Sequence, residues 1–130
     1  MTRILMTSLL MTAIAVGSIL PSNAFAADAE AGKAKFLALC ISCHGESGKG
    51  DGPTGLALAA AGQPAPRDFT IGEFVLDPDK DGTKGSDSDL KAVITKGAMA
   101  FGGSPLMAPV AGLTDADLDN MVAFIRSLKQ

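Results

Sequence analysis

Large aromatic side chains are scarce in this sequence. It contains no Trp and no Tyr, and its aromatic residues of this class are six Phe. Phe, Tyr and Trp dominate the energetics of protein cores because each buries a large apolar area. A small domain with so few of them has little material with which to fill its own centre. We therefore expect something other than side chains to occupy part of the core.

The sequence also lacks a basic segment. It has 11 Lys and Arg against 14 Asp and Glu, a formal net charge of −3. Of the 11 basic residues only Arg3 lies in residues 1–26, so residues 27–130 carry a formal net charge of −4. Proteins that bind nucleic acid neutralise phosphates with clustered Lys and Arg. The charge balance therefore excludes nucleic acid as a partner.

The first 26 residues have the pattern of a secretory signal peptide. Arg3 precedes an apolar and small-residue stretch at residues 9–20, and Ala24-Phe25-Ala26 supplies small residues at a cleavage position. This apolar stretch is shorter than the about 20 residues that a membrane-spanning helix needs. We expect cleavage after Ala26 rather than a retained anchor. Residues 27–130 would then form one domain in the periplasm, with no stable insertion in the membrane.

Apolar residues recur at helical spacing in residues 27–130, and no alternating strand pattern of useful length is present. Segments rich in Gly and Pro separate the helical ones and predict loops at residues 45–55 and 98–113. The predicted helices are residues 28–40, residues 56–61, a segment capped by Asp87 or Ser88 that ends at Gly97, and a segment capped by Thr114 whose apolar stripe ends at Leu128. The predicted fold class is all-α with long loops.

Both cysteines and the only histidine lie in one pentapeptide, Cys40-Ile41-Ser42-Cys43-His44. This C-x-x-C-H spacing is the attachment motif of c-type haem, in which two thiols add to the porphyrin vinyl groups and the adjacent imidazole faces the iron. A disulfide between these cysteines would close too short a loop to add much stability. A thioredoxin-like pair would need a βαβ context. We predict that Cys40 and Cys43 hold one covalent haem and that His44 binds its iron.

The second axial ligand cannot be another histidine of this chain. Three of the six Met lie in residues 27–130. Met121 lies on the apolar stripe of the last helix, which predicts core packing. Met107 lies in a loop bounded by Pro105 and Pro109, which would hold a thioether near the iron without a further ordering cost, and Met99 follows a helix end. We expect Met107 to be the second axial ligand, with Met99 as the alternative.

With these residues in place, the sequence resembles the class I cytochromes c over nearly all of residues 27–130. That family has Gly and Phe four residues apart on its first helix, here Gly32 and Phe36, and an aromatic residue on its last helix that crosses at the Gly, here Phe124. The family also has a Gly-Pro pair whose Pro carbonyl accepts a hydrogen bond from the iron-binding His, and Gly52-Pro53 is similar to that pair. The resemblance implies a class I cytochrome c fold, with three to five helices wrapped around one covalent haem.

A haem iron with both His and Met bound has no open position for a substrate. These ligands therefore predict an electron carrier rather than an enzyme, one that shuttles single electrons between redox partner proteins through transient docking. Two alternatives stay open. The chain could be the haem c subunit of an exported dehydrogenase or oxidase complex. It could also be a five-coordinate gas-binding haem protein, although the absence of a second His counts against that reading.

Two further motifs are weaker. Arg67 is a candidate to neutralise a haem propionate, the alternative being an ordinary exposed Arg. Residues 77–82, Asp-Pro-Asp-Lys-Asp-Gly, reproduce the first half of a calcium-binding loop, but Ser88 stands at the twelfth position, where a Glu with both oxygens on the ion is expected. We favour an acidic, solvated loop over a calcium site at Asp77–Asp81.

Overall fold

In a computed structural model of the chain, the described residues are 26–130. They form five α-helices and one 3₁₀-helix with no strand, which confirms the predicted all-α class with its long loops. In chain order the elements are α1 (Ala29–Leu39), α2 (Ile41–His44), α3 (Pro53–Ala60), α4 (Asp87–Lys96), the 3₁₀-helix η1 (Ala98–Phe101) and α5 (Asp115–Ser127). No helix of this part of the chain is long and apolar enough to cross a membrane. The predicted signal peptide lies outside the described residues except for Ala26.

Helix ends follow the local capping residues. The Asp28 carboxylate accepts the backbone N–H groups of the first turn of α1, and Thr114 caps α5 as predicted. The cap of α4 is Ser86 rather than Asp87 or Ser88. Ser86 takes the capping position because Asp89 lies three residues later. The side chain of each residue then accepts a hydrogen bond from the backbone N–H of the other. Asp87 instead becomes the first residue of the helix.

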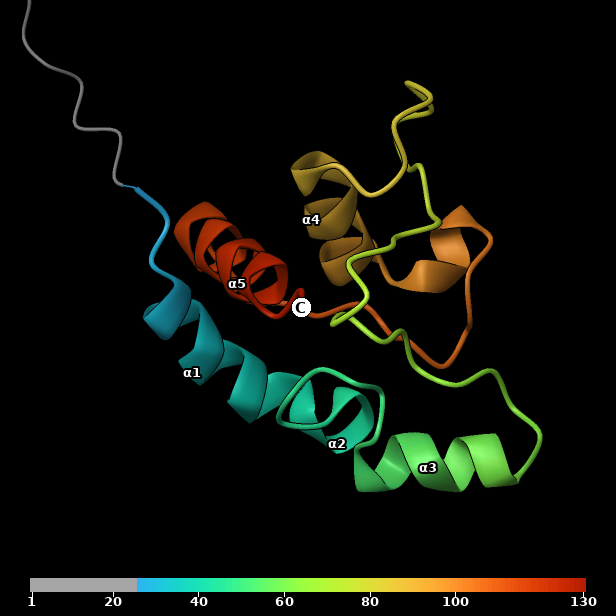
Figure 1. The fold of residues 1–130 in the computed structure, drawn as a ribbon. Helices are drawn as coiled ribbons and strands as arrows, with labels where there is room; N and C mark the ends of the chain where they lie inside the picture. The colour runs from blue at the N-terminus through green and yellow to red at the C-terminus, as the bar shows by residue number, and fades with distance from the viewer. Residues whose placement is uncertain (1–25) are drawn as a thin grey trace, which may run out of the picture.

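The first and last helices pack against each other at Gly32 (Figure 1). A Cβ atom placed on Gly32 would lie 1.9 Å from the backbone oxygen of Asn120 in α5. Only glycine therefore allows the two backbones to approach this closely. One turn further on, the rings of Phe36 and Phe124 pack with their centroids 5.2 Å apart. The expected crossing is confirmed, with Asn120 and Met121 at the point of closest approach and Phe124 beside it.

The buried core is built around this crossing. Its members are apolar side chains from α1, α4, α5 and the segment between α3 and α4: Phe36, Phe69, Leu90, Ile94, Leu118, Val122, Phe124 and Ile125. Met121 is 0% exposed, which confirms that it is a core residue. Two ion pairs join α4 to α5, one between Lys91 and Asp119 and one between Arg126 and Asp87. The core thus holds α1, α4 and α5 together.

We expect Gly32→Ala to destabilise the protein by about 1–3 kcal/mol or more, because the added methyl group would force α1 and α5 apart. Helix propensity alone predicts the opposite sign, a gain of about 1 kcal/mol. Chemical denaturation followed by circular dichroism measures the difference. Ala34→Gly is the matched control, since Ala34 is an exposed residue of the same helix and its loss of propensity should cost about 1 kcal/mol. A stabilised Gly32→Ala protein would contradict the close-packing argument.

The capping network of α5 predicts a loss of stability in acid. Hydrogen bonds from the backbone and hydroxyl of Thr114, then the ammonium of Lys35 at 3.1 Å, lower the pKa of Asp117 from 3.8 to about 2. The stabilisation is therefore complete above the unfolded pKa and is lost as the pH falls from about 4 to about 2. Asp117→Asn should unfold at a lower temperature than wild type at pH 7. The difference in unfolding temperature between the two proteins should narrow steadily as the pH falls from about 4 to about 2. A difference that stays constant down to pH 2 would refute the assignment.

Candidate functional site

The candidate site is centred on α2, the single helical turn that holds the C-x-x-C-H motif. Cys40 lies at the junction of α1 and α2, and both Cys40 and Cys43 are half-buried thiols that form no disulfide. Burial, and then the neighbouring Cys43, raise the pKa of Cys40 to about 11. Redox-active dithiols need a lowered thiol pKa. The described residues form no strand, so they also lack the βαβ context of a thioredoxin-like pair.

The glycine-rich loop that follows α2 wraps closely around it. The backbone N–H of Gly50 donates to the His44 carbonyl at 2.8 Å, and that of Gly52 donates to the Cys43 carbonyl at 3.2 Å. A Cβ atom on Gly52 would lie 2.4 Å from the Ile41 carbonyl oxygen, so a side chain at this position would push the loop away. The loop thus fixes the backbone that carries the two thiols and the imidazole.

The imidazole of His44 is held by a backbone carbonyl. Its Nδ1 lies 3.3 Å from the carbonyl oxygen of Arg67. Because a carbonyl only accepts, Nδ1 carries the proton and Nε2 keeps its lone pair. Burial lowers the pKa of His44, and the Arg67 carbonyl offsets part of that effect. The neutral ring with a free Nε2 is the form that binds a metal.

We expected the Pro53 carbonyl to accept this hydrogen bond, and in this structure the recorded acceptor is the Arg67 carbonyl. Pro53 is the first residue of α3, where its missing N–H and fixed φ suit the helix start. The chain then passes through Pro64 and Pro66 and returns to α2 at Arg67, and this return brings the Arg67 carbonyl to His44. The type of interaction expected for the iron-binding His is therefore present, but a residue 14 positions further along the chain provides it.

Phe69 is a site residue that the sequence analysis did not assign. Its ring stacks on the His44 imidazole with a centroid distance of 4.6 Å and an interplanar angle of 18°. Its backbone N–H donates to the Gly48 carbonyl at 2.7 Å, which ties it to the glycine-rich loop. Phe36 lies 6.2 Å away and connects the stack to the α1–α5 crossing. The available signal was that Phe69 is one of few aromatic residues and lies two positions after Arg67.

The two candidate methionines lie in different environments. Met107 is half-buried and packs against the hydrophobic core, whereas Met99 is 69% exposed. The backbone around Met107 is anchored to the end of α4, because Ala98 donates to the Met107 carbonyl at 3.1 Å and Val110 donates to the Ile94 carbonyl at 2.9 Å. Such a loop holds a side chain in place. Met107 therefore lies in an anchored loop beside the core, and Met99 lies on the exposed surface.

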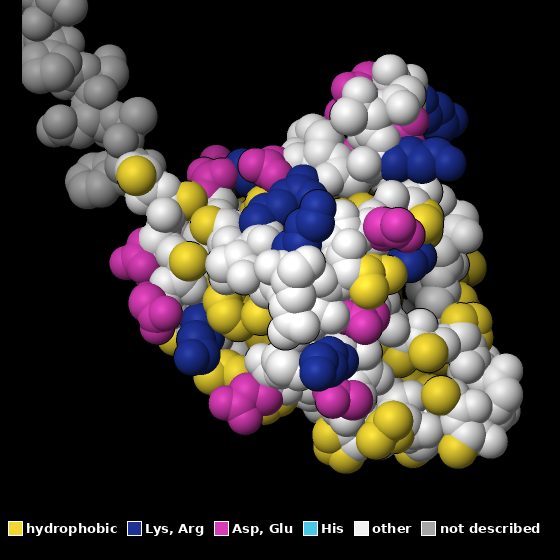
Figure 2. All heavy atoms as spheres, viewed as in Figure 1, with side chains coloured by type: hydrophobic (Ala, Val, Ile, Leu, Met, Phe, Trp, Pro, Cys, Tyr) yellow, Lys and Arg dark blue, Asp and Glu magenta, His cyan; other side chains and the backbone are white. Residues whose placement is uncertain are grey.

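The donor set fits a covalently attached haem. Two unpaired thiols and an imidazole with a free nitrogen lie within one turn of helix. Six large hydrophobic residues are at least 43% exposed: Leu39, Leu56, Ile71, Val75, Met99 and Leu106. Figure 2 shows hydrophobic side chains gathered at the lower right, over α3. These features agree with the small aromatic content of the chain.

Comparison with known proteins identifies the family. The sequence matches the Cytochrome c family over residues 29–129. It is 36% identical to cytochrome c-554(547) of Halothiobacillus neapolitanus over 106 residues, which cover 80% of this chain and 100% of that protein. Its fold is similar to a chain of the reducing HAO-like protein complex of Kuenenia stuttgartiensis, with a TM-score of 0.61 and 29% identity. That match covers 78% of this chain but only 43% of the other one.

The family binds haem c covalently, and Cys40 and Cys43 have the spacing that attachment requires. Haem c supplies a one-electron couple between ferrous and ferric iron, and members of the family exchange electrons with redox partner proteins. The helical fold, the position of the motif and the matched range agree with one another. This chain therefore belongs to the cytochrome c family and is a c-type haem electron carrier of class I.

Proposed function

We propose that this chain is an exported, diffusing electron carrier in which His44 and Met107 are the axial ligands of the haem iron. The observation that carries the proposal is the arrangement of His44. Its Nδ1–H donates a hydrogen bond to the Arg67 carbonyl, which leaves Nε2 free. His44 belongs to the same helical turn as the two unpaired thiols. This arrangement holds one nitrogen ready for iron beside the two points of covalent attachment.

Each site residue has a distinct task in this proposal. The Arg67 carbonyl fixes the tautomer and orientation of His44. The same hydrogen bond makes Nε2 more basic and so a stronger ligand for iron. Phe69 stacks on the imidazole and limits its rotation. Met107 provides a thioether from an anchored loop, and a thioether ligand raises the reduction potential relative to a second imidazole. With both axial positions taken, the chain transfers electrons without binding a substrate.

The proposal also assigns the Arg67 side chain to a haem propionate. Arg67 is half-buried, and its backbone carbonyl is hydrogen-bonded to the His44 imidazole. Its side chain therefore branches from the backbone next to the proposed iron ligand. A guanidinium can form two parallel hydrogen bonds to a carboxylate. Partners are expected to dock weakly and leave quickly, because a shuttle must release one protein to reach the next. The formal net charge of −4 on residues 27–130 favours partners with positive patches.

A subunit role in a larger complex is the second candidate. It is favoured by the similarity to part of a longer chain in the HAO-like complex. The match to cytochrome c-554(547) favours a separate small carrier, because that whole protein is covered by the alignment. Purifying a tagged copy from its native cells would distinguish the two. We expect elution as a small single species, and constant recovery with a larger redox chain would instead show that it is a subunit.

Met107→Ala should abolish the weak near-infrared band that a Met sulfur gives when bound to ferric haem, and it should lower the reduction potential. The reason is that Met107 lies against the core whereas Met99 extends into solvent. Met99→Ala is the matched control and should leave both properties unchanged. The measurement uses the oxidised absorption spectrum of the haem-loaded protein.

Two results would contradict this assignment. Loss of the band only in Met99→Ala would make Met99 the ligand. If wild-type protein lacks the band and its ferrous form binds carbon monoxide readily, one axial position is open, which would favour the gas-binding alternative over the electron shuttle.

A further inference from the structure

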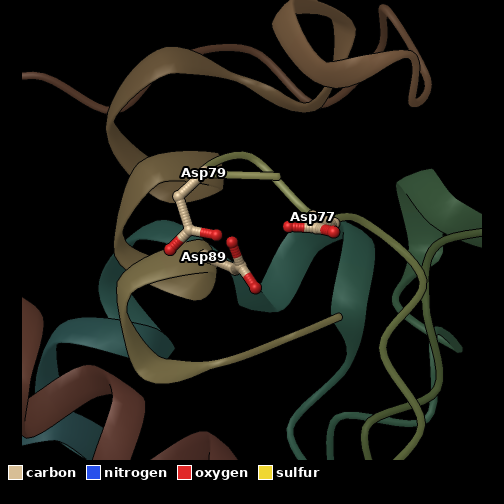
Figure 3. Close-up of side chains that lie close together, drawn as sticks. All are labelled: Asp77, Asp79 and Asp89. Atoms are coloured by element: carbon tan, nitrogen blue, oxygen red, sulfur yellow. The ribbon is translucent and has the colours of Figure 1, made fainter. Parts of the chain in front are cut away.

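Three aspartates far from the haem-attachment motif form a compact cluster at the start of α4. Asp77 and Asp79 lie in the preceding loop, and Asp89 lies in the first turn of the helix. One carboxylate oxygen from each lies within 4.8 Å of the others. Figure 3 shows the three carboxylates turned toward one another. Three negative charges this close repel one another unless a cation lies between them.

Asp89 is the unusual member of this cluster because its side chain is only 1% exposed. Its Oδ2 accepts the Ser86 N–H at 2.9 Å, which accounts for its role in capping α4. Its Oδ1 is buried and has no hydrogen-bond partner, and the same is true of Asp77 Oδ1. Buried carboxylate oxygens without partners are costly. The capping role therefore explains one oxygen of Asp89 and leaves the other unexplained.

None of the ion pairs among the described residues involves these three aspartates. The ion pairs there join Lys35 to Asp117, Lys91 to Asp119 and Arg126 to Asp87, all outside the cluster. Burial raises the pKa of Asp89, but hydrogen bonds from Ser86 and from the backbone of Asp79 and Gly85 together outweigh that effect and hold the pKa below its ordinary value. Asp89 is thus charged at neutral pH as well as buried. A bound cation would neutralise the buried charge of Asp89.

The loop conformation supports the same reading. The Gly82 N–H donates to Asp77 Oδ2 at 3.0 Å, which folds residues 77–82 back on their first carboxylate. Ser88 stands where a calcium loop normally has its closing Glu, and its hydroxyl donates to Asp79 at 3.2 Å. The next residue, Asp89, supplies the missing carboxylate from α4. The helix thereby completes an oxygen donor set that the loop sequence alone leaves open.

We propose that Asp77, Asp79 and Asp89 bind one Ca²⁺ ion and so connect the 77–82 loop to the first turn of α4. All the donors are oxygens, which suits a hard cation rather than a transition metal. Calcium suits a flexible loop better than magnesium does, because magnesium demands a near-ideal octahedral arrangement. The occupied loop would hold the segment that leads into α4. Three residues before Asp77, Phe74 packs on Phe69 with a centroid distance of 6.0 Å.

The test titrates the haem-loaded protein with CaCl₂ by isothermal calorimetry after removal of bound ions with a chelator. We expect one site with Kd about 10⁻⁴ to 10⁻³ M, the range of weaker calcium modules. Calcium at 10 mM should raise the Tm by about 4 °C or more, and the same concentration of magnesium should give a clearly smaller shift.

Asp89→Asn and Asp77→Asn should each weaken calcium binding at least about tenfold, since each removes one ligand charge. Asp115→Asn is the matched control, an exposed Asp in the first turn of α5, and should leave Kd within about twofold. If Asp89→Asn does not fold, Asp77→Asn decides the question, because Asp77 lies in the loop. The proposal fails if wild-type protein shows neither heat nor a Tm shift at 10 mM calcium. It also fails if magnesium matches calcium, or if the folded variants bind as tightly as wild type.

Discussion

The close approach of α1 and α5 at Gly32 is the constraint on which the rest of this structure depends. A hydrogen atom in place of a side chain lets the α1 backbone pack directly on the Asn120 carbonyl of α5. The same approach brings Phe36 against Phe124, and Phe36 in turn lies near Phe69 and the His44 ring. Aromatic pairs of this kind contribute about 0.5–1.5 kcal/mol each beyond their buried area. A chain of aromatic contacts therefore connects the α1–α5 crossing to the His44 imidazole.

The site itself is assembled from backbone as much as from side chains. The glycine-rich loop donates N–H groups to the carbonyls of Cys43 and His44, and the returning segment offers the Arg67 carbonyl to the imidazole. Backbone contacts depend on the path of the chain and tolerate many side chains. This explains how a chain with few aromatic residues can still orient one imidazole and two thiols within a single helical turn.

Acidic side chains at two places on the molecule differ in how their charges are compensated. Asp117 is satisfied by Thr114 and Lys35, and it has the low pKa expected of such a carboxylate. The aspartates at the start of α4 include buried oxygens without partners, although Asp89 also caps the helix. Similar residue types thus serve purely structural ends in one place and form a candidate ion site in another. The difference lies in which neighbours the fold brings to them.

The sequence by itself determined the helical class, the α1 and α5 helices and the haem-attachment motif, because periodicity, capping and the C-x-x-C-H spacing are local properties of the chain. It could not identify Arg67 as the hydrogen-bond partner of His44, the stacking of Phe69 on that ring, or Asp89 as the third member of an acidic cluster. Each of these pairs residues from segments separated by a loop. Only the tertiary structure decided them, since the path of a loop depends on how the helices pack and not on the spacing of its residues.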